Sequence, residues 1–532
     1  MPGTKKRMVR FGPGTVDGDI ASEYYGNKAA GLAELVGMGI PVPPGFALSV
    51  ELCEEYYAAN EKAPADLAEL LREGISFLER ITQSKFGGTR KPLLVSVRSG
   101  AAVSMPGVME TLLNIGLTRE SVRGLIFLTG NPRFAWDTYR RALQNFGQVI
   151  YGLNQGWFHT RLQEVMAGEG VPDEVELDAH SLKVLCDEYE KEFSSVVGED
   201  FPQDVYTQLE LAALGVIRSW AAPRALAFRK MNLVQGARGT AVTVQNMVYG
   251  NLGSQSGAGV AFTRNPWKGD NELVIDFKFG AQGEDVVSGD QAATTQDEFR
   301  ASMPEVFDQL SGIGKTLELH FHDMQDIEFT VQEGDLFILQ TRVGKRSPYA
   351  ALVIAVNMVL EGILTSSDAL WLLRDVDIDS ITILKIRSRD YPIAIGVPAS
   401  SGVASGKIVF SNERAAQEAG EGSDVILVRE TASPDDLPGI HVARGLLTAR
   451  GARTSHAAVV ARQLGKICVV NCTTLEIDLS RHRCTIGGQE LREGEIITID
   501  GNTGRVYLGE MEVVLEKPRD LIDLVRSWEN TG

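Results

Sequence analysis

The stretch GLLTARGARTSHAAVVARQLGKICVV, residues 445–470, has the clearest local pattern in the chain. Its apolar opening predicts the end of a strand, and a polar loop containing glycine follows. From His456 to Leu464, apolar residues recur at intervals of three and four, which predicts a helix. Gly465 is typical of a helix end, and ICVV predicts a second buried strand. The pattern therefore favours a strand–loop–helix–strand unit with His456 in the first turn of the helix.

The position of His456 suits phosphoryl chemistry. Thr454 and Ser455 precede it, and both residue types are favoured at helix N-caps. Free backbone N–H groups and the positive end of the helix dipole stabilise an anion at such a terminus. A neutral imidazole can attack phosphorus, and the phosphoryl group it acquires would lie against that terminus. From this local pattern alone, a histidine that only packs is the commoner alternative, so the rest of the chain has to decide.

Length, charge and cysteine content restrict the class of protein. A chain of 532 residues is too long for one core and predicts two to four domains. A formal net charge of −18 argues against binding nucleic acid or anionic membranes, but it allows a local basic pocket for phosphate. The basic N-terminal residues lack the apolar stretch typical of a signal peptide, and the longest apolar run is too short to span a membrane, so we expect neither feature. Five scattered cysteines fit buried thiols in a reducing compartment. We therefore expect a cytoplasmic protein without nucleic-acid or membrane partners.

Two basic residues in the first hundred are candidate phosphate ligands. Lys28 precedes a predicted amphipathic helix, where a lysine is unfavourable for the helix dipole unless a phosphate balances it. Arg98 follows the buried strand LLVSV, and an arginine fork fixed at a strand end can bind phosphate oxygens in pairs. The alternatives are an ordinary exposed lysine and an arginine paired with a carboxylate.

The middle of the chain gives weaker signals. Residues 118–230 predict a mainly helical scaffold, with Arg141 on one of its helices. Residues 239–266 predict two strands around a glycine-rich hairpin loop that includes Gly257, and backbone amides of such a loop can close over phosphates. Glycine-rich hairpins are common, however. SGIGKT, at 311–316, has the ending of a P-loop but lacks its earlier glycine, so we reject that interpretation.

A second hairpin carries acidic residues. Residues 323–346 alternate as two strands joined by a tight turn. Asp326 and Glu328 share a face of the first strand, and Gln340 and Arg342 share a face of the second. Oxygens from adjacent strands, together with an arginine, would suit magnesium and a triphosphate. A solvated hairpin face is the alternative, but acidic residues within so apolar a hairpin need partners.

Taken in order, these motifs resemble those of pyruvate phosphate dikinase, of the phosphoenolpyruvate-utilising enzymes. The resemblance rests on LLVSVRSGAAVSMPG, VAFTRNP, AQGEDVVSG, DMQDIEFTVQEG, LQTR and ARTSHAAVVARQLGK, and it covers nearly the whole sequence. The sister enzyme, phosphoenolpyruvate synthase, usually has a more acidic segment after the SVRS arginine, so the dikinase is the better match. The sequence departs from the family's motifs at two places. GARTSH replaces the family's GGMTSH, which puts Arg453 near His456, and GNKA replaces GGKG around Lys28.

The resemblance implies an α/β and α+β multidomain fold. An ATP-grasp nucleotide-binding domain would cover 1–345, with the largely helical insertion at 118–230. A helical linker at 346–390 would lead to a β/α phosphohistidine swivelling domain at 391–510, and a helical tail would occupy 511–532.

The resemblance also implies roles for individual residues. His456 would be the phosphoryl carrier, and Arg98 and Arg342 would be catalytic with it. Glu328 and Gln340 would hold Mg²⁺, and Thr454 matches the residue that is phosphorylated for regulation in plant members. The residues implied to bind ATP are Lys28, Arg98, Arg141, Gly257, Glu284, Asp326, Glu328, Gln340 and Arg342.

By analogy, His456 attacks the β-phosphorus of ATP and releases AMP, inorganic phosphate takes the outer group to give pyrophosphate, and the phosphohistidine then phosphorylates pyruvate to phosphoenolpyruvate. The chain ends where full-length members continue into a TIM barrel that binds pyruvate and phosphoenolpyruvate. A separate chain or a missing part would then supply that barrel. The alternatives are a free-standing histidine phosphocarrier with another acceptor, a phosphoenolpyruvate synthase-like enzyme, and a non-catalytic relic, which the presence of the candidate residues disfavours.

Overall fold

The structure is a computed structural model in which the described residues form two compact units. Unit 1 comprises Met1–Gly253 with Phe337–Gln340, and unit 2 comprises Ser254–Leu336 with Thr341–Gly532. No helix in the described part of the chain combines the length and apolar character needed to cross a membrane. The described residues are 6–18, 20–101, 109–231, 238–283, 294, 296–387, 390–432, 436–451 and 456–529.

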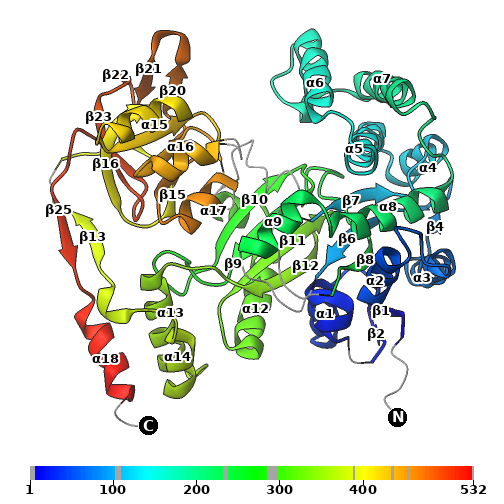
Figure 1. The fold of residues 1–532 in the computed structure, drawn as a ribbon, viewed down its shortest axis with the longest axis horizontal. Coiled ribbons are helices and arrows are strands. Elements are labelled where there is room, and N and C mark those ends of the chain that lie inside the picture. Colours follow the sequence, from blue (N-terminus) through cyan, green and yellow to red (C-terminus); the bar gives the residue numbers. More distant parts are fainter. Residues whose placement is uncertain are drawn as a thin grey trace. The chain divides into compact units, whose positions relative to one another are not determined.

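Unit 1 is built on a six-stranded antiparallel sheet with the strand order β2-β1-β3-β8-β6-β7. Its inner strands are almost wholly apolar because both of their faces are buried, as in GFAL of β3 and AVTV of β8. Helices α1, α2, α3 and α8 contact this sheet (Figure 1). The strands are β1 (Met8–Gly12), β2 (Thr15–Val16), β3 (Gly45–Leu48), β6 (Val95–Gly100), β7 (Thr111–Ile115) and β8 (Ala241–Asn246), and the first helices are α1 (Ser22–Gly37), α2 (Val50–Ala58) and α3 (Leu67–Thr82).

The region predicted to be helical, 118–230, consists of six α-helices with one short 3₁₀ turn (Figure 1, cyan to green). The boundaries of α5 follow from its sequence. Asn131 caps the helix by accepting a hydrogen bond from the Phe134 N–H at 3.0 Å, and Gly152 ends it in the left-handed region at φ 68°. The helices are α4 (Arg119–Thr129), α5 (Pro132–Tyr151), α6 (Gln155–Glu169), α7 (Ala179–Val197), α8 (Val205–Ser219) and α9 (Pro223–Met231).

Unit 2 begins with a four-stranded sheet in the order β10-β9-β11-β12. The predicted hairpin at 239–266 is wrong, because β8 pairs with β3 and β6, whereas β9 pairs with β10 and β11. The predicted hairpin at 323–346 is present as β11 and β12, and SGIGKT lies inside helix α12, as its rejection requires. The elements are β9 (Gly257–Phe262), β10 (Val274–Phe279), α11 (Gln296–Ser302), α12 (Pro304–Phe321), β11 (Gln325–Gln332) and β12 (Asp335–Val343).

Helices α13, α14 and α18 share an apolar core in which Leu352, Leu373 and Ile522 are buried. The segment predicted as a helical tail, 511–532, also contains a strand, β25, which pairs antiparallel with β13. Local periodicity did not indicate this strand, because its partner lies more than a hundred residues earlier in the chain. The elements are α13 (Pro348–Leu360), α14 (Ser366–Leu373), β13 (Ile383–Ile386), β25 (Val513–Glu516) and α18 (Arg519–Glu529).

The last part of unit 2 contains an eight-stranded mixed sheet in the order β14-β24-β23-β16-β17-β18-β19-β15. Strands β16 to β19 run parallel to one another, which requires helical crossovers between them. The predicted strand–loop–helix–strand unit is confirmed as β18 (Gly445–Thr448), α17 (His456–Gln463) and β19 (Ile467–Val470). The other elements are β14 (Ala394–Ile395), β15 (Val397–Ser400), β16 (Val403–Val409), α15 (Asn412–Gly420), β17 (Val425–Arg429), α16 (Leu437–Val442), β23 (Ile496–Asp500) and β24 (Arg505–Leu508).

Candidate active site

The predicted acidic residues of β11 lie beside the predicted arginine of β12. The Nε atom of Arg342 donates a hydrogen bond to Oδ2 of Asp326 at 2.8 Å, and its Nη2 lies 3.6 Å from Oε1 of Glu328. Across β9, Val260 lies opposite both Glu328 and Asp276, so these two carboxylates belong to the same face of the sheet. The structure therefore brings three acidic residues and one arginine to one face of the sheet.

This cluster contains a buried oxygen that protein groups leave unsatisfied. Oδ1 of Asp326 is buried and has no hydrogen-bond partner within the described part of the chain. Burial raises the pKa of Asp326, although Arg342 opposes the change. Burial also disfavours the charge on Arg342, but Asp326 and Glu328 outweigh it and raise the pKa of the guanidinium. Asp326 therefore lies in surroundings that offer its carboxylate fewer contacts than a charge would require.

Two further cations, Lys345 and Arg462, adjoin the cluster, and neither was predicted from the sequence. Burial lowers the pKa of Lys345, and the neighbouring Arg342 and Arg462 lower it further. Burial also lowers the pKa of Arg462, against the attraction of Asp276 and Asp326. A phosphate-bearing ligand would stabilise the charged forms of both side chains. The available signals were the position of Lys345 directly after LQTRVG and that of Arg462 on the helix that begins at His456.

Arg462 also joins α17 to the first part of unit 2. Its Nη2 donates to the carbonyl oxygen of Ala399 at 3.0 Å, and its guanidinium carbon lies 5.3 Å from the centroid of the Trp267 ring. The indole N–H of Trp267 donates to the same carbonyl oxygen at 2.6 Å, and the tryptophan is buried. These contacts hold the helix that begins at His456 near the carboxylates of β10 and β11. The side chain of His456, together with Thr454 and Glu284, lies outside the described residues.

Unit 1 brings the other two predicted phosphate ligands onto neighbouring segments. Lys28 lies inside α1, two residues after a break in the helix at Gly26, whose φ is 77°. A Cβ at Gly26 would collide with the carbonyl oxygen of Gly100, and the Asn27 N–H donates to Ala101 O at 3.1 Å. The break in α1 therefore packs against the end of β6, the strand that carries Arg98. Lys28 thus belongs to the first turn after the break, as its expected place at a helix start implies.

The predicted ATP ligand Arg141 lies in an ion-pair network of its own. Its Nε and Nη2 contact Asp137 at 3.0 Å and Glu174 at 2.5 Å. The adjacent Arg140 contacts the same two carboxylates at 2.8 and 3.1 Å, and Asn251 donates to Asp137 at 3.1 Å. The geometry gives Arg141 a structural role, and its contact with ATP stays a prediction.

The two remaining predicted ligands have different surroundings. Gly257 is the first residue of β9, not part of an open loop, and a Cβ at this position would collide with the ring of Phe277. Its glycine is therefore explained by aromatic packing, while contact with phosphate stays a prediction. Gln340 lies half-buried on β12, two residues before Arg342. That spacing places both side chains on the same side of the strand, as expected.

Comparison with known proteins identifies the family to which this chain belongs. The AMP/ATP-binding domain of pyruvate phosphate dikinase matches residues 22–307 and 304–359, and the mobile domain of PEP-utilising enzymes matches residues 421–504. The chain belongs to the pyruvate phosphate dikinase family. The second match includes the whole of β18, α17 and β19, so His456 lies within a mobile domain of this family. The resemblance inferred from the sequence motifs is thereby confirmed.

Several dikinases are similar over almost all of this chain. It is 43% identical over 533 residues to pyruvate, phosphate dikinase 1, chloroplastic, of Oryza sativa subsp. japonica, covering 99% of this chain and 56% of the relative. It is 42% identical over 543 residues to pyruvate, phosphate dikinase of Rhizobium meliloti (strain 1021), covering 99% of this chain and 60% of the relative. The chain therefore spans somewhat more than half the length of the curated relatives it matches.

Proposed function

We propose that this chain is the nucleotide and carrier portion of a dikinase, and that it phosphorylates its own His456 with ATP. The observation that carries the proposal is the cluster on β11 and β12, which Arg462 joins from the helix that begins at His456. A site that donates phosphorus to a histidine needs cations for the phosphate oxygens and a way to hold the histidine's helix nearby.

We assign the nucleotide-binding role to an ATP-grasp domain at 1–345, with its helical insertion at 118–230. A helical linker at 346–390 would connect it to the swivelling phosphohistidine domain at 391–510, followed by the tail. Lys28, Arg98 and Arg342 would bind phosphate oxygens, and Arg342 would stabilise the charge that develops as phosphorus is transferred. We also propose a cytoplasmic location, in keeping with the net charge and the five free, buried cysteines.

The residues present fit a bound Mg²⁺. Magnesium prefers hard oxygen ligands. Three are available here: the buried Oδ1 of Asp326, which has no hydrogen-bond partner among the described residues, the half-buried carboxylate of Glu328 and the amide oxygen of Gln340. The described residues include no group of three or more His, Cys, Asp or Glu side chains arranged to hold a metal. The remaining ligands would then be phosphate oxygens and water, as is usual for Mg²⁺. When bound, the ion would neutralise charge on the triphosphate.

The proposed reaction proceeds through the imidazole of His456. A ring nitrogen forms a bond to the β-phosphorus of ATP, the bond from that phosphorus to the AMP oxygen breaks, and AMP leaves. Inorganic phosphate then attacks the outer phosphorus and departs as pyrophosphate, which leaves a phosphohistidine. Pyruvate would be the final acceptor, giving phosphoenolpyruvate, and a pyruvate-binding barrel, on another chain or in a part not included in this sequence, would complete the reaction.

The test is to label the protein with ATP carrying radioactive phosphorus at the β or the γ position. We expect acid-labile labelling of the wild type from β-labelled ATP and none in His456→Asn. With inorganic phosphate present, the γ label should leave as pyrophosphate while the β label stays on the protein. Label that persists in His456→Asn would remove this histidine from the mechanism. Release of the γ label as inorganic phosphate, without added phosphate, would indicate synthase chemistry instead.

A further inference from the structure

Lys278 lies on the sheet of the proposed active site but is not among the residues predicted from the sequence. It belongs to β10 and is half-buried. Its side chain forms no hydrogen bond or ion pair with the part of the chain that the structure describes. A charged group that loses water without gaining a partner is unfavourable. This position therefore suits an anion that the protein itself does not supply.

The alternation of β10 places Lys278 on the same face as the carboxylates. Phe277 points to the opposite face, where its ring centroid lies 4.5 Å from that of Phe299 and 5.9 Å from that of Phe329. Asp276 and Lys278 are two residues apart in the strand, so both belong to the other face. One side of β10 is thus committed to aromatic packing, and Lys278 lies on the side that carries the proposed chemistry.

The register of the sheet separates Lys278 from Arg342. Lys278 lies opposite Ala258 of β9. Asp326, which binds Arg342, lies opposite Phe262 of the same strand. With the strand order β10-β9-β11-β12, the two cations are about 14 Å apart along the strands and about 14 Å apart across them. Each side chain covers only part of that diagonal, so the two cations are placed to contact different parts of one elongated ligand.

The surroundings of Lys278 on this face are small or uncharged. Ala258 and Val260 of β9 are buried, and Thr330 of β11 lies opposite Ala258. Asp276 shares the face with Lys278, but no ion pair joins the two side chains. Compensation of a protein carboxylate therefore does not account for the lysine.

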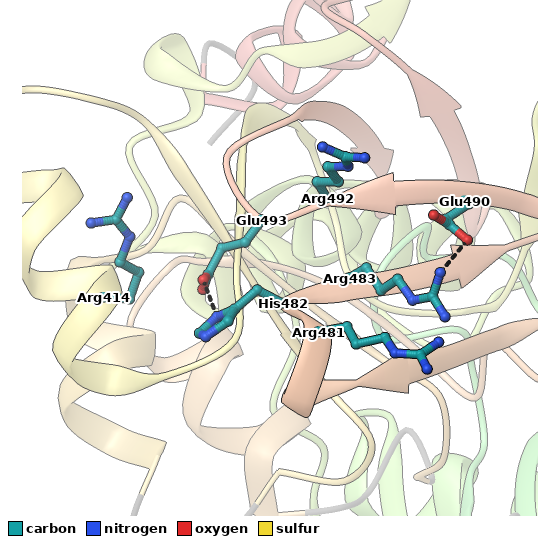
Figure 2. Close-up of a pocket in the computed structure, with 7 residues that line it drawn as sticks. All are labelled: Arg414, Arg481, His482, Arg483, Glu490, Arg492 and Glu493. Atoms are coloured by element: carbon teal, nitrogen blue, oxygen red, sulfur yellow. Dashed lines mark hydrogen bonds and ion pairs between the residues drawn. The ribbon is translucent and has the colours of Figure 1, made fainter.

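The pocket in Figure 2 is the contrasting case, because its basic side chains have carboxylate partners. Arg483 contacts Glu490 at 2.6 Å, and the ring of His482 lies 2.8 Å from Glu493. Nothing in that pocket requires an external anion. It lies at the three-stranded sheet of β20 (Leu475–Asp478), β21 (Arg483–Ile486) and β22 (Gln489–Arg492).

The position of Lys278 selects one end of ATP. Arg342 and Arg462 adjoin Asp326, and Arg462 comes from the helix that begins at His456. The phosphates that are transferred to the histidine belong at that end of the face, which leaves the α-phosphate towards Lys278. Resting on the self-phosphorylation proposed for this chain, we propose that Lys278 binds the α-phosphate of ATP and stabilises AMP as the leaving group.

The leaving group gains charge as the histidine reacts. A ring nitrogen of His456 forms its bond to the β-phosphorus, and the bond from that phosphorus to the oxygen shared with the α-phosphate breaks. The electron pair stays on this oxygen, so AMP leaves as a dianion. The Lys278 ammonium neutralises the added charge without giving up a proton. Because this charge is larger in the transition state than in bound ATP, the lysine accelerates the step.

The first measurement is equilibrium binding of AMP, ATP or pyrophosphate, with Mg²⁺, to the full chain carrying His456→Asn. Lys278→Met removes the charge and keeps the length of the side chain. The matched control, Lys315→Met, makes the same change at an exposed lysine of α12. We expect Lys278→Met to raise the Kd for AMP and for ATP about tenfold, through loss of a hydrogen bond between charged groups. The Kd for pyrophosphate, and every Kd of the control, should stay nearly unchanged.

The second measurement is single-turnover self-labelling of chains that retain His456, with saturating β-labelled ATP. Lys278→Met should slow this step about tenfold or more, because the charge on the leaving group loses its partner. Release of the γ label by inorganic phosphate should keep its rate, since the bond to AMP is already broken. Lys278→Arg, which restores a cation, should recover most of both losses.

The outcomes separate this assignment from the proposed function. Absence of self-labelling in the wild type would overturn the proposed function, while binding of AMP would still decide whether Lys278 holds the α-phosphate. Unchanged affinity for AMP in Lys278→Met would overturn the assignment, and so would an equal loss of affinity for pyrophosphate. If Lys278→Met does not fold, Lys278→Gln replaces it with the same expected results.

Discussion

The ion-pair network on α5 and the cluster on β11 and β12 contain the same chemical groups but differ in how completely those groups are satisfied. On α5, Asp137 and Glu174 bind two arginines through contacts of 2.5–3.1 Å. On the sheet, one buried oxygen of Asp326 has no hydrogen-bond partner among the residues that the structure describes, and desolvation lowers the pKa of both Lys345 and Arg462. An arginine beside a carboxylate therefore does not by itself indicate a ligand site.

The difference teaches where to look for chemistry in this fold. A network in which each arginine contacts carboxylates contributes mainly to stability, whereas a desolvated and incompletely hydrogen-bonded cluster is a candidate for binding a ligand.

The largest expected effect is on stability, from Asp137→Asn. The change keeps the side-chain volume but removes the negative charge between Arg140 and Arg141, and Arg140 is buried. Breaking a buried pair leaves an uncompensated charge, so the free energy of unfolding should fall by about 3–5 kcal/mol. Denaturant unfolding at neutral pH measures it. Glu164→Gln, which breaks an exposed pair with Arg161, is the control and should cost less than about 1 kcal/mol.

The two carboxylates should also respond to pH with opposite signs. Although burial opposes it, Arg141 and Arg140 hold the pKa of Asp137 well below its usual value. Its stabilising contribution is therefore present above the unfolded pKa of about 3.9 and lost as pH falls through the folded pKa. Burial raises the pKa of Asp326, so its contribution is lost as pH rises through that raised value. Unfolding midpoints measured against pH should lose the acid-side decline in Asp137→Asn and the opposite decline in Asp326→Asn.

The next effect is on rate, from Arg342→Ala. If this guanidinium stabilises charge in the transferring phosphate, its loss should raise the activation free energy of self-labelling by about 2–4 kcal/mol, which slows the rate roughly thirtyfold to a thousandfold. The free energy of unfolding should change far less than in Asp137→Asn, because Arg342 is only half-buried. Single-turnover labelling with β-labelled ATP measures the rate. An unchanged rate together with a large loss of stability would place this cluster in the same class as the α5 network.

A smaller effect on affinity is expected from Lys345→Gln. The lysine side chain is exposed, but its charge is partly desolvated and lies beside two arginines, so its removal should leave the unfolding midpoint unchanged or raise it. Loss of a charged contact to phosphate should raise the Kd for ATP about tenfold, which corresponds to about 1.4 kcal/mol. Equilibrium binding of ATP to the His456→Asn background measures this without turnover. A midpoint that falls by several degrees with unaltered affinity would show that Lys345 is structural.

The smallest effect should come from Asn131→Ala, which removes the cap of α5 but none of its ion pairs. The lost hydrogen bond to the Phe134 N–H should cost about 1 kcal/mol. If this change instead costs as much as Asp137→Asn, the stability assigned to the ions belongs to the helix as a whole. Denaturant unfolding under the same conditions gives the comparison directly.

Part of the fold could be predicted from local sequence patterns, and part could not. The β18–α17–β19 unit and the β11–β12 hairpin followed from local periodicity, because each is continuous in sequence and buries one side. The hairpin expected at 239–266 failed because strand propensity does not specify a partner strand, and β8 and β9 belong to different sheets. Gly257 shows the same limit. The sequence alone does not distinguish a glycine required by packing against a phenylalanine ring from a glycine in a phosphate-binding loop.

Contacts in the candidate site could be predicted where both partners belong to one continuous motif. Asp326 and Arg342 face each other because two strands of one hairpin set their register. Arg462 was not predictable in this way, since its neighbours Trp267 and Asp326 come from segments more than a hundred residues away. For Arg141, the partner Asp137 was visible one helical turn earlier, but Glu174 was not.

The break in α1 makes Gly26 important for the position of the residues that follow it. Gly26 contacts the backbone of Gly100 where any side chain would act as a wedge, and its φ of 77° already excludes most residues. Even a single added methyl group would push the segment bearing Lys28 off the end of the strand bearing Arg98. Such a change would keep both charged side chains but would alter the distance between the segments that carry them. Glycine at position 26 is thus as necessary for the placement of the two cations as the cations are for binding phosphate.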